Sequence, residues 1–167
     1  MLNSGGNMKI LVILIISFSI TISANDYEYG KEVKSAFDSG NISLAIKTNE
    51  KIASNSTKEY WYGKFTKYYF DRGELKSATK YNEKLSSTST REYWYGKFLK
   101  YNFDRGNIEK AFNWNEKLSN INTKDYWYSK FTKHYFDRNN LIKARVMASL
   151  ISNSDSKTYW INKINRG

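Results

Sequence analysis

Tyr60-Trp61-Tyr62-Gly63-Lys64-Phe65 recurs unchanged at residues 93–98 and, with Ser129 in place of the glycine, at residues 126–131. It ends as Tyr159-Trp160, so the tryptophans 61, 94, 127 and 160 are spaced by 33 residues. Without gaps, residues 60–86 and 93–119 are identical at 18 of 27 positions. A fixed period of this length is typical of stacked units, none of which can bury its apolar face alone.

The first half of each unit has the sequence pattern of an amphipathic helix. Hydroxyl residues at one phase precede the helical run and are predicted N-caps: Thr57, Thr90, Thr123 and Ser156. Acidic residues follow in the first turn, where the helix dipole favours negative charge: Glu59, Glu92 and Asp125. In the second unit the apolar face is predicted to be formed by Trp61, Tyr62, Phe65, Tyr68 and Tyr69.

A turn and a second helix are predicted to complete each unit. Gly73, Gly106 and Asn139 follow Asp-Arg pairs and suit a left-handed helix cap. The second helix is expected over about residues 74–86, with Leu75, Ala78, Tyr81 and Leu85 on its buried side. One alanine recurs at a single phase, where a small side chain lets two helices cross closely: Ala45, Ala78, Ala111 and Ala144.

The chain is therefore predicted to be all-α, with about four helix–turn–helix units and a final helix. The expected units are residues 25–56, 57–89, 90–122 and 123–155, with a capping helix over residues 156–167. In the first unit, Glu28 and Glu32 stand where Trp61 and Phe65 stand in the second. This change fits a terminal unit, one face of which has no neighbour.

Residues 1–24 are expected to be a signal peptide. Lys9 precedes an apolar run of about a dozen residues that ends in small residues at Ser23 and Ala24. The run is short for a bilayer span, which needs about 20 residues; an uncleaved anchor is the alternative. Translation starting at Met8 would give a more usual leader. The protein is thus expected to be exported, either to a periplasm or outside the cell.

The amino-acid composition says more about the kind of partner that the protein binds than about any activity. The chain of 167 residues has 27 basic and 16 acidic residues, a net charge of +11, and neither Cys nor Pro. The charge favours an acidic protein, an anionic polymer or a membrane surface, and an exported protein is not expected to bind nucleic acid. The absence of cysteine excludes disulfides.

The repeat resembles the tetratricopeptide repeat. The matching positions are Tyr62, Phe65, Tyr69, Gly73 and Ala78, with their counterparts in the next two units, and the resemblance covers about residues 26–160. The period is 33, the family's unit-ending proline is missing, and Thr66, Leu99 and Thr132 replace its small glycine. The resemblance implies a short right-handed α-solenoid whose first helices line a concave surface that binds peptides or partner helices.

Carried over residue by residue, that surface gives the candidate binding site. Its expected members are Tyr60, Lys64, Lys67, Phe70, Tyr93, Lys97, Lys100, Phe103, Tyr126, Lys130, Lys133 and Phe136. Aromatic rings beside lysines suit a partner that carries carboxylates and apolar side chains. The alternative is that the aromatic residues pack between units and the lysines form a solvated face.

Nothing in the sequence predicts catalysis. There is no phosphate-binding glycine loop, nucleophile motif or metal-ligand cluster, so we expect no enzyme, cofactor or metal. His134 takes the place of Tyr68 and Tyr101 and is interpreted as a core substitution. Three functions remain: a protein-binding adaptor, regulator or toxin-neutralising module, which we favour; a binder of anionic polymer or membrane surface; and an enzyme with an unrecognised site.

Overall fold

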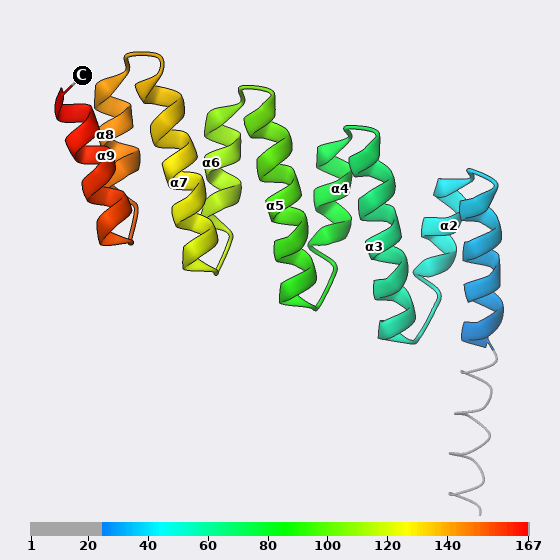
Figure 1. The fold of residues 1–167 in the computed structure, drawn as a ribbon. Helices are drawn as coiled ribbons and strands as arrows, with labels where there is room; N and C mark the ends of the chain where they lie inside the picture. The colour runs from blue at the N-terminus through cyan, green and yellow to red at the C-terminus, as the bar shows by residue number, and fades with distance from the viewer. Residues whose placement is uncertain (1–24, 167) are drawn as a thin grey trace, which may run out of the picture. The chain divides into compact units, whose positions relative to one another are not determined.

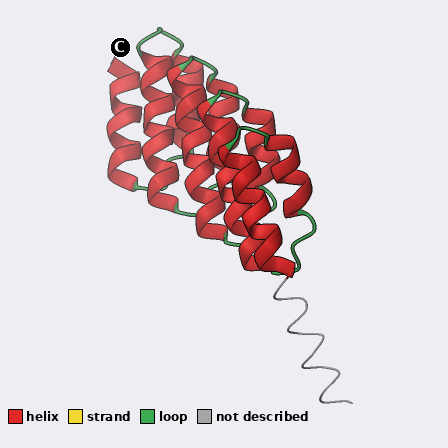
Figure 2. Cartoon of the chain, turned by 90° about the vertical axis from the view of Figure 1, so that its right-hand side faces the viewer, coloured by secondary structure: helices red, strands yellow, loops and turns green. Residues whose placement is uncertain are grey.

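The structure, a computed structural model, describes residues 25–166, and every regular element in that range is a helix (Figures 1 and 2). The predicted signal peptide and alternative start codon lie outside the described residues. The first helix occupies residues 25–38. The others are α2 (Ile42–Asn49), α3 (Asn55–Asp71), α4 (Leu75–Asn82), α5 (Thr88–Asp104), α6 (Ile108–Glu116), α7 (Ile121–Phe136), α8 (Leu141–Ser149) and α9 (Ser154–Arg166).

The chain divides into two compact units, one ending at Ser86 and the other starting at Ser87. In unit 1, α3 packs on α4 and α2 contacts α3. In unit 2, α5 packs on α6, α7 on α8, and α9 covers both α7 and α8. The prediction of an all-α chain of helix pairs is confirmed for the described residues. None of these helices combines the length and apolar composition needed to cross a bilayer.

The core forms where the repeat predicts it. Phe65, Phe98 and Phe131 are completely buried, as are all four alanines at the helix-crossing position. The second helices are shorter than expected, because α4 ends at Asn82 and α6 at Glu116. Leu85 and Leu118 nevertheless remain buried from the loops that follow these helices.

The predicted N-caps are wrong by three residues. The cap of α3 is Ser54, whose Oγ accepts a hydrogen bond from the Thr57 backbone N–H at 3.4 Å. Ser87 caps α5 and Asn120 caps α7 in the same way. The first helices therefore begin earlier than the apolar pattern indicates, because their first turn carries polar residues on all sides. The C-terminal caps are as predicted: Gly73, Gly106 and Asn139 all adopt positive φ.

The prediction of acidic residues in the first turn is wrong, because α3, α5 and α7 begin earlier than expected and have no acid there. Acidic residues at this phase make long-range contacts instead. Asp26 accepts hydrogen bonds from the backbone N–H groups of Ala53 and Ser54 at 2.7 and 2.8 Å. Asp125 binds the N–H groups of Ser152 and Asn153 at 2.8 Å each. Glu59 accepts one such bond from Ser86 at 3.2 Å. Each acid thus holds the loop that begins 27 residues later; we call this contact the carboxylate clasp.

Candidate binding surface

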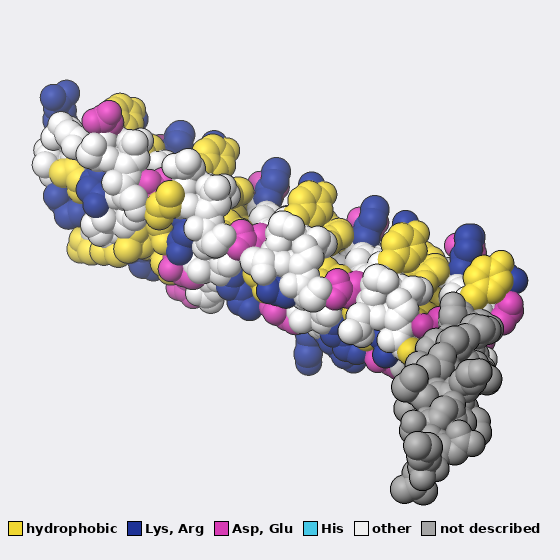
Figure 3. All heavy atoms as spheres, turned by 90° about the horizontal axis from the view of Figure 1, so that it is seen from below, with side chains coloured by type: hydrophobic (Ala, Val, Ile, Leu, Met, Phe, Trp, Pro, Cys, Tyr) yellow, Lys and Arg dark blue, Asp and Glu magenta, His cyan; other side chains and the backbone are white. Residues whose placement is uncertain are grey.

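The outer side of the helix over residues 25–38, of α3 and of α5 carries the same set of residues at the same register, and α7 differs by Ser129 in place of the glycine. In α3 this set is Tyr60, Gly63, Lys64, Lys67 and Asp71, and we call it the outer stripe. The first helix of each repeat carries a tyrosine at the position of Tyr60, as does α9, and these five tyrosines are 55–64% exposed. Figure 3 shows exposed hydrophobic rings beside Lys or Arg side chains within each unit. Burial therefore gives no reason for these residues to recur.

One lysine of each stripe is neutralised within its own helix. Nζ of Lys67, Lys100 and Lys133 lies 2.6 Å from a carboxylate oxygen of Asp71, Asp104 and Asp137, respectively. Lys34 and Asp38 form the same pair in the first helix, and this hydrogen bond raises the pKa of Lys34. The partners are four residues apart and therefore lie on one helix face. Lys67, Lys100 and Lys133, which were predicted to belong to the binding site, are thus each engaged in an ion pair within their own helix.

The other lysine of each stripe lies over an aromatic ring. Nζ of Lys64, Lys97 and Lys130 is 5.2 Å from the ring centroid of the tyrosine four residues earlier. Among the described residues, no carboxylate oxygen lies within ion-pair distance of these three ammonium groups. A cation held over a ring keeps its charge available while its position is restricted. These are therefore the cations of α3, α5 and α7 that can receive a carboxylate from a partner.

A glycine in the middle of the stripe leaves open space beside the ring. A Cβ added at Gly30, Gly63 or Gly96 would meet no atom within 4 Å, and each glycine lies inside a helix. Glycine there costs a helix about 0.5–1 kcal/mol relative to alanine. No neighbouring atom of the chain requires glycine at these positions, and α7 has Ser129 at the corresponding one.

The phenylalanines of the predicted site lie differently. Phe70, Phe103 and Phe136 are half-buried. The Phe103 ring contacts Trp127 and Phe131, with centroids 5.3 and 5.7 Å apart, and Phe136 contacts Trp160 at 6.4 Å. Packing between first helices thus accounts for Phe103 and Phe136, as in the alternative interpretation, and leaves their exposed edges at the border of the stripe.

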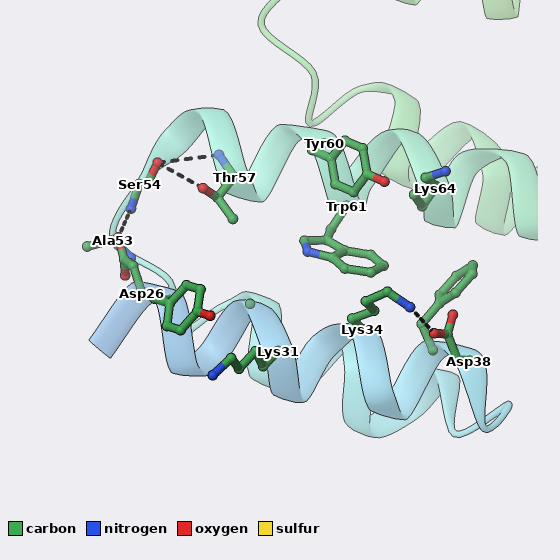
Figure 4. Close-up of a pocket in the computed structure, with 13 residues that line it drawn as sticks. Asp26, Lys31, Lys34, Asp38, Ala53, Ser54, Thr57, Tyr60, Trp61 and Lys64 are labelled. Atoms are coloured by element: carbon green, nitrogen blue, oxygen red, sulfur yellow. Dashed lines mark hydrogen bonds and ion pairs between the residues drawn. The ribbon is translucent and has the colours of Figure 1, made fainter. Parts of the chain in front are cut away.

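In unit 1 the outer stripes of two first helices form the sides of an open groove of about 950 Å³. Figure 4 shows Lys31 and Lys34 on the first helix opposite Tyr60 and Lys64 on α3, and Tyr27 also lines the groove. Between the two helices lies the Trp61 indole, packed on Phe37 with centroids 5.6 Å apart. The Asp26 clasp to Ser54 closes one end. An aromatic floor between cationic sides suits a chain that has both apolar and acidic side chains.

The sequence reasoning missed the first helix as part of this surface. Its stripe is Tyr27, Gly30, Lys31, Lys34 and Asp38, and each residue lies 33 positions before its counterpart in α3. The register alone would have located these residues. They were overlooked because the buried positions of the same helix had changed, and the whole unit was interpreted as a degenerate cap.

Other polar groups hold the repeats together. The Tyr62 hydroxyl donates to Glu50 Oε2 at 3.2 Å, and Lys84 Nζ donates to Glu50 Oε1 at 2.6 Å. The hydrogen bond from Lys84 lowers the pKa of Glu50. Tyr128 and Glu116 form the equivalent contact at 2.5 Å. These groups connect one helix pair to the next first helix and are already engaged with each other.

The described residues offer no metal centre. No group of three or more His, Cys, Asp or Glu side chains among residues 25–166 could hold an ion. His134 is half-buried and lies edge-on against Tyr135 and Phe103. Burial lowers its pKa, and the charge of Arg138 lowers it further. It lies where the sequence interpretation placed it, among aromatic side chains.

Comparisons with known protein families, with curated proteins and with solved structures each found no match.

Proposed function

We propose that this protein is a binding module that holds an acidic polypeptide against the outer stripes of its first helices. The observation that carries the proposal is the first helix, which keeps Tyr27, Gly30, Lys31, Lys34 and Asp38 although its buried positions have changed. Residues that recur only for packing would have changed with the core. A surface that recurs without it is best explained by a partner.

The internal ion pairs favour a protein partner over a generic polyanion. Each stripe of the first helix, α3, α5 and α7 has two lysines and one aspartate, so its net charge is about +1 at neutral pH. A polyanion would be attracted most by unpaired cations, whereas here one cation of each stripe is compensated. In α3 and α5, fixed rings, an open glycine and a single unpaired lysine suit a partner with side chains of matching spacing. In α7 the glycine is replaced by Ser129, and in the helix over residues 25–38 Lys31 is also paired, with Glu28 at 3.3 Å.

Two further proposals complete the functional hypothesis. The apolar run before residue 25 supports export, and the module would then act in a periplasm or outside the cell as an adaptor, regulator or toxin-neutralising protein. The helix pairs, the buried alanines and the positive-φ caps support a tetratricopeptide-like repeat within each unit. Neither proposal involves catalysis or a cofactor.

The test is charge reversal of the three available lysines. The variant Lys64→Glu, Lys97→Glu, Lys130→Glu breaks no ion pair among the described residues, so helicity and melting temperature should stay unchanged. The partner is first captured from an envelope or secreted fraction and then titrated by calorimetry. We expect its affinity to fall about tenfold or more, since each exposed ion pair contributes about 0.2–1 kcal/mol.

A matched control reverses three exposed lysines on second helices, namely Lys76, Lys80 and Lys110. This variant has the same net charge as the first, so a generic polyanion should lose affinity for both equally. Equal losses would therefore replace the protein partner with an anionic polymer. An unchanged affinity of the Lys64, Lys97 and Lys130 variant would place the binding surface elsewhere.

A further inference from the structure

Helix α8 differs from the other second helices at its outward positions. At one register, Lys76 and Lys80 lie in α4 and Lys84 just after its end, while Glu109 and Asn113 lie in α6 and Lys117 is its C-cap. The same three positions in α8 are Ile142, Val146 and Leu150. Polar and charged side chains are thus replaced by aliphatic ones at three successive turns of a single helix face.

These aliphatic side chains are not covered within the protein. Ile142 is 82% exposed, Val146 51% and Leu150 40%. Figure 3 shows the resulting hydrophobic patch at the C-terminal end of unit 2, on the side of its second helices. A contiguous exposed apolar patch generally marks an interaction site, whereas single exposed apolar residues need no explanation. We call this patch the α8 face.

A groove adjoins the α8 face. It has a volume of about 410 Å³ and lies between α6 and α8. Its lining combines the apolar side chains of Ile108, Phe112, Val146 and Met147 with Glu109, Asn113, Tyr135 and Lys143. Phe112 stands where α4 has Thr79, so this wall is also more apolar than its counterpart. A ridge of aliphatic side chains beside an aromatic-lined groove can receive the apolar side of a partner helix.

The charge around the face indicates the character of that helix. Leu141–Ser149 contains Lys143 and Arg145, both exposed, and no acidic residue. Arg145 donates to the neutral Asn165 Oδ1 at 2.7 Å and so keeps its charge. A second copy of this chain would bring like charges together on a protein of net charge +11. A nine-residue helix, about 13 Å long, is also short for the interface of about 1,200 Å² or more that a stable dimer needs.

We propose that the α8 face and its groove bind an amphipathic helix of another protein, with aliphatic side chains on one side and acidic residues flanking them. This surface consists of second-helix residues, and it is independent of the outer stripes of the first helices. The protein would then have two binding surfaces. The outer stripes would bind through tyrosine rings and lysines, and the α8 face would bind by burying aliphatic side chains.

The test uses a synthetic fluorescent peptide with leucine at helical spacing and glutamate and alanine elsewhere, titrated by anisotropy against the full chain. The variant Ile142→Lys, Val146→Lys, Leu150→Lys installs the residues of α4 at this register and should fold normally. We expect saturable binding to the unmodified protein and a loss of at least about tenfold in the variant. Since the variant gains positive charge, a loss isolates the aliphatic contact from electrostatic attraction.

Three controls decide the outcome. A peptide with lysine in place of glutamate should bind weakly, and equal binding of both peptides would overturn the acidic character of the partner. The Lys64, Lys97 and Lys130 variant should retain the part of the acidic peptide's binding that the α8 variant loses, which separates the α8 face from the outer stripes, where the proposed function also expects an acidic chain to bind. Unchanged affinity of the α8 variant would overturn the proposal. The proposal would also be overturned if sedimentation velocity detected a dimer of the unmodified chain and only a monomer of the α8 variant, because a second copy of the chain would then cover the α8 face.

Discussion

The helix over residues 25–38 and α3 share an outer face and differ in their buried face. Where α3 has Trp61, Phe65 and Tyr69, the first helix has Glu28, Glu32 and Ala36. Both glutamates are exposed, and Glu32 accepts a hydrogen bond from Thr48 Oγ1 at 3.0 Å. The outer stripe, by contrast, is identical in the two helices. The buried residues of the repeat thus vary independently of those exposed on its outer side.

The largest effect is expected from the buried face of α3. Phe65→Ala removes a completely buried ring and should lower the free energy of unfolding by about 3–5 kcal/mol. Tyr60→Ala, on the outer stripe of the same helix, should change it by about 0.5 kcal/mol or less. Urea denaturation followed by circular dichroism measures both. Similar losses would show that the outer ring stabilises the fold and would weaken the argument from its recurrence.

A smaller effect should distinguish the observed N-cap from the one that the sequence pattern predicts. Ser54→Ala removes the oxygen that accepts from the Thr57 N–H and should cost about 1 kcal/mol. Thr57→Ala keeps that bond and should cost clearly less. Thermal melts of the two variants compare them directly, and the opposite ranking would restore Thr57 as the cap.

The glycines of the outer stripe should have opposite effects on stability and binding. Gly63→Ala and Gly96→Ala add a methyl group where no atom lies within 4 Å, so each should stabilise the protein by about 0.5–1 kcal/mol. If a partner approaches closely there, the double variant should bind it more weakly in spite of its higher melting temperature. A double variant that is stabilised and binds normally would leave the glycines without a role in recognition.

The smallest expected effect concerns His134. Burial lowers the pKa of its imidazole in the folded protein. In the unfolded chain the imidazole has its ordinary pKa of about 6.5, so below that pH the unfolded chain binds a proton more readily than the folded chain does. Stability should therefore fall as the pH drops through this range. His134→Tyr, which restores the residue found as Tyr68 and Tyr101, should reduce this loss. Parallel denaturant curves at pH 8 and pH 5.5 measure the difference between the two proteins.

The sequence predicts the elements of the fold that depend on short-range pattern. The positive-φ caps at Gly73 and Asn139 follow from residue type, and the burial of Phe65 and Ala78 follows from helical spacing. The ion pair of Lys67 with Asp71 was not predicted, although a separation of four residues on a helix allows it. The N-caps were misplaced because Ser54 and Thr57 are both good caps, and only the backbone geometry decides between them.

The carboxylate clasp could not have been predicted from spacing alone. Asp26 and Ser54 are 28 residues apart, and their contact depends on the exact lengths of two helices and a turn. Only the recurrence of an acid at the phase of Asp26, Glu59 and Asp125 hinted at a common role. The face of α8 was likewise missed, because Ile142 and Val146 fit an ordinary apolar helix pattern until their exposure is known.

The clasp also has a consequence for how such a chain can change in length. Each acid holds a loop at the end of its own repeat, so a 33-residue cassette carries both partners of the contact with it. Deleting residues 93–125 would remove one 33-residue repeat and place Glu92 directly before Tyr126, where Asp125 now stands. An acidic residue would then still lie 27 residues before Ser152, the first residue of the loop that Asp125 binds. A gene encoding this protein can therefore gain or lose whole repeats while every loop keeps its carboxylate contact. Each such change would add or remove one outer stripe.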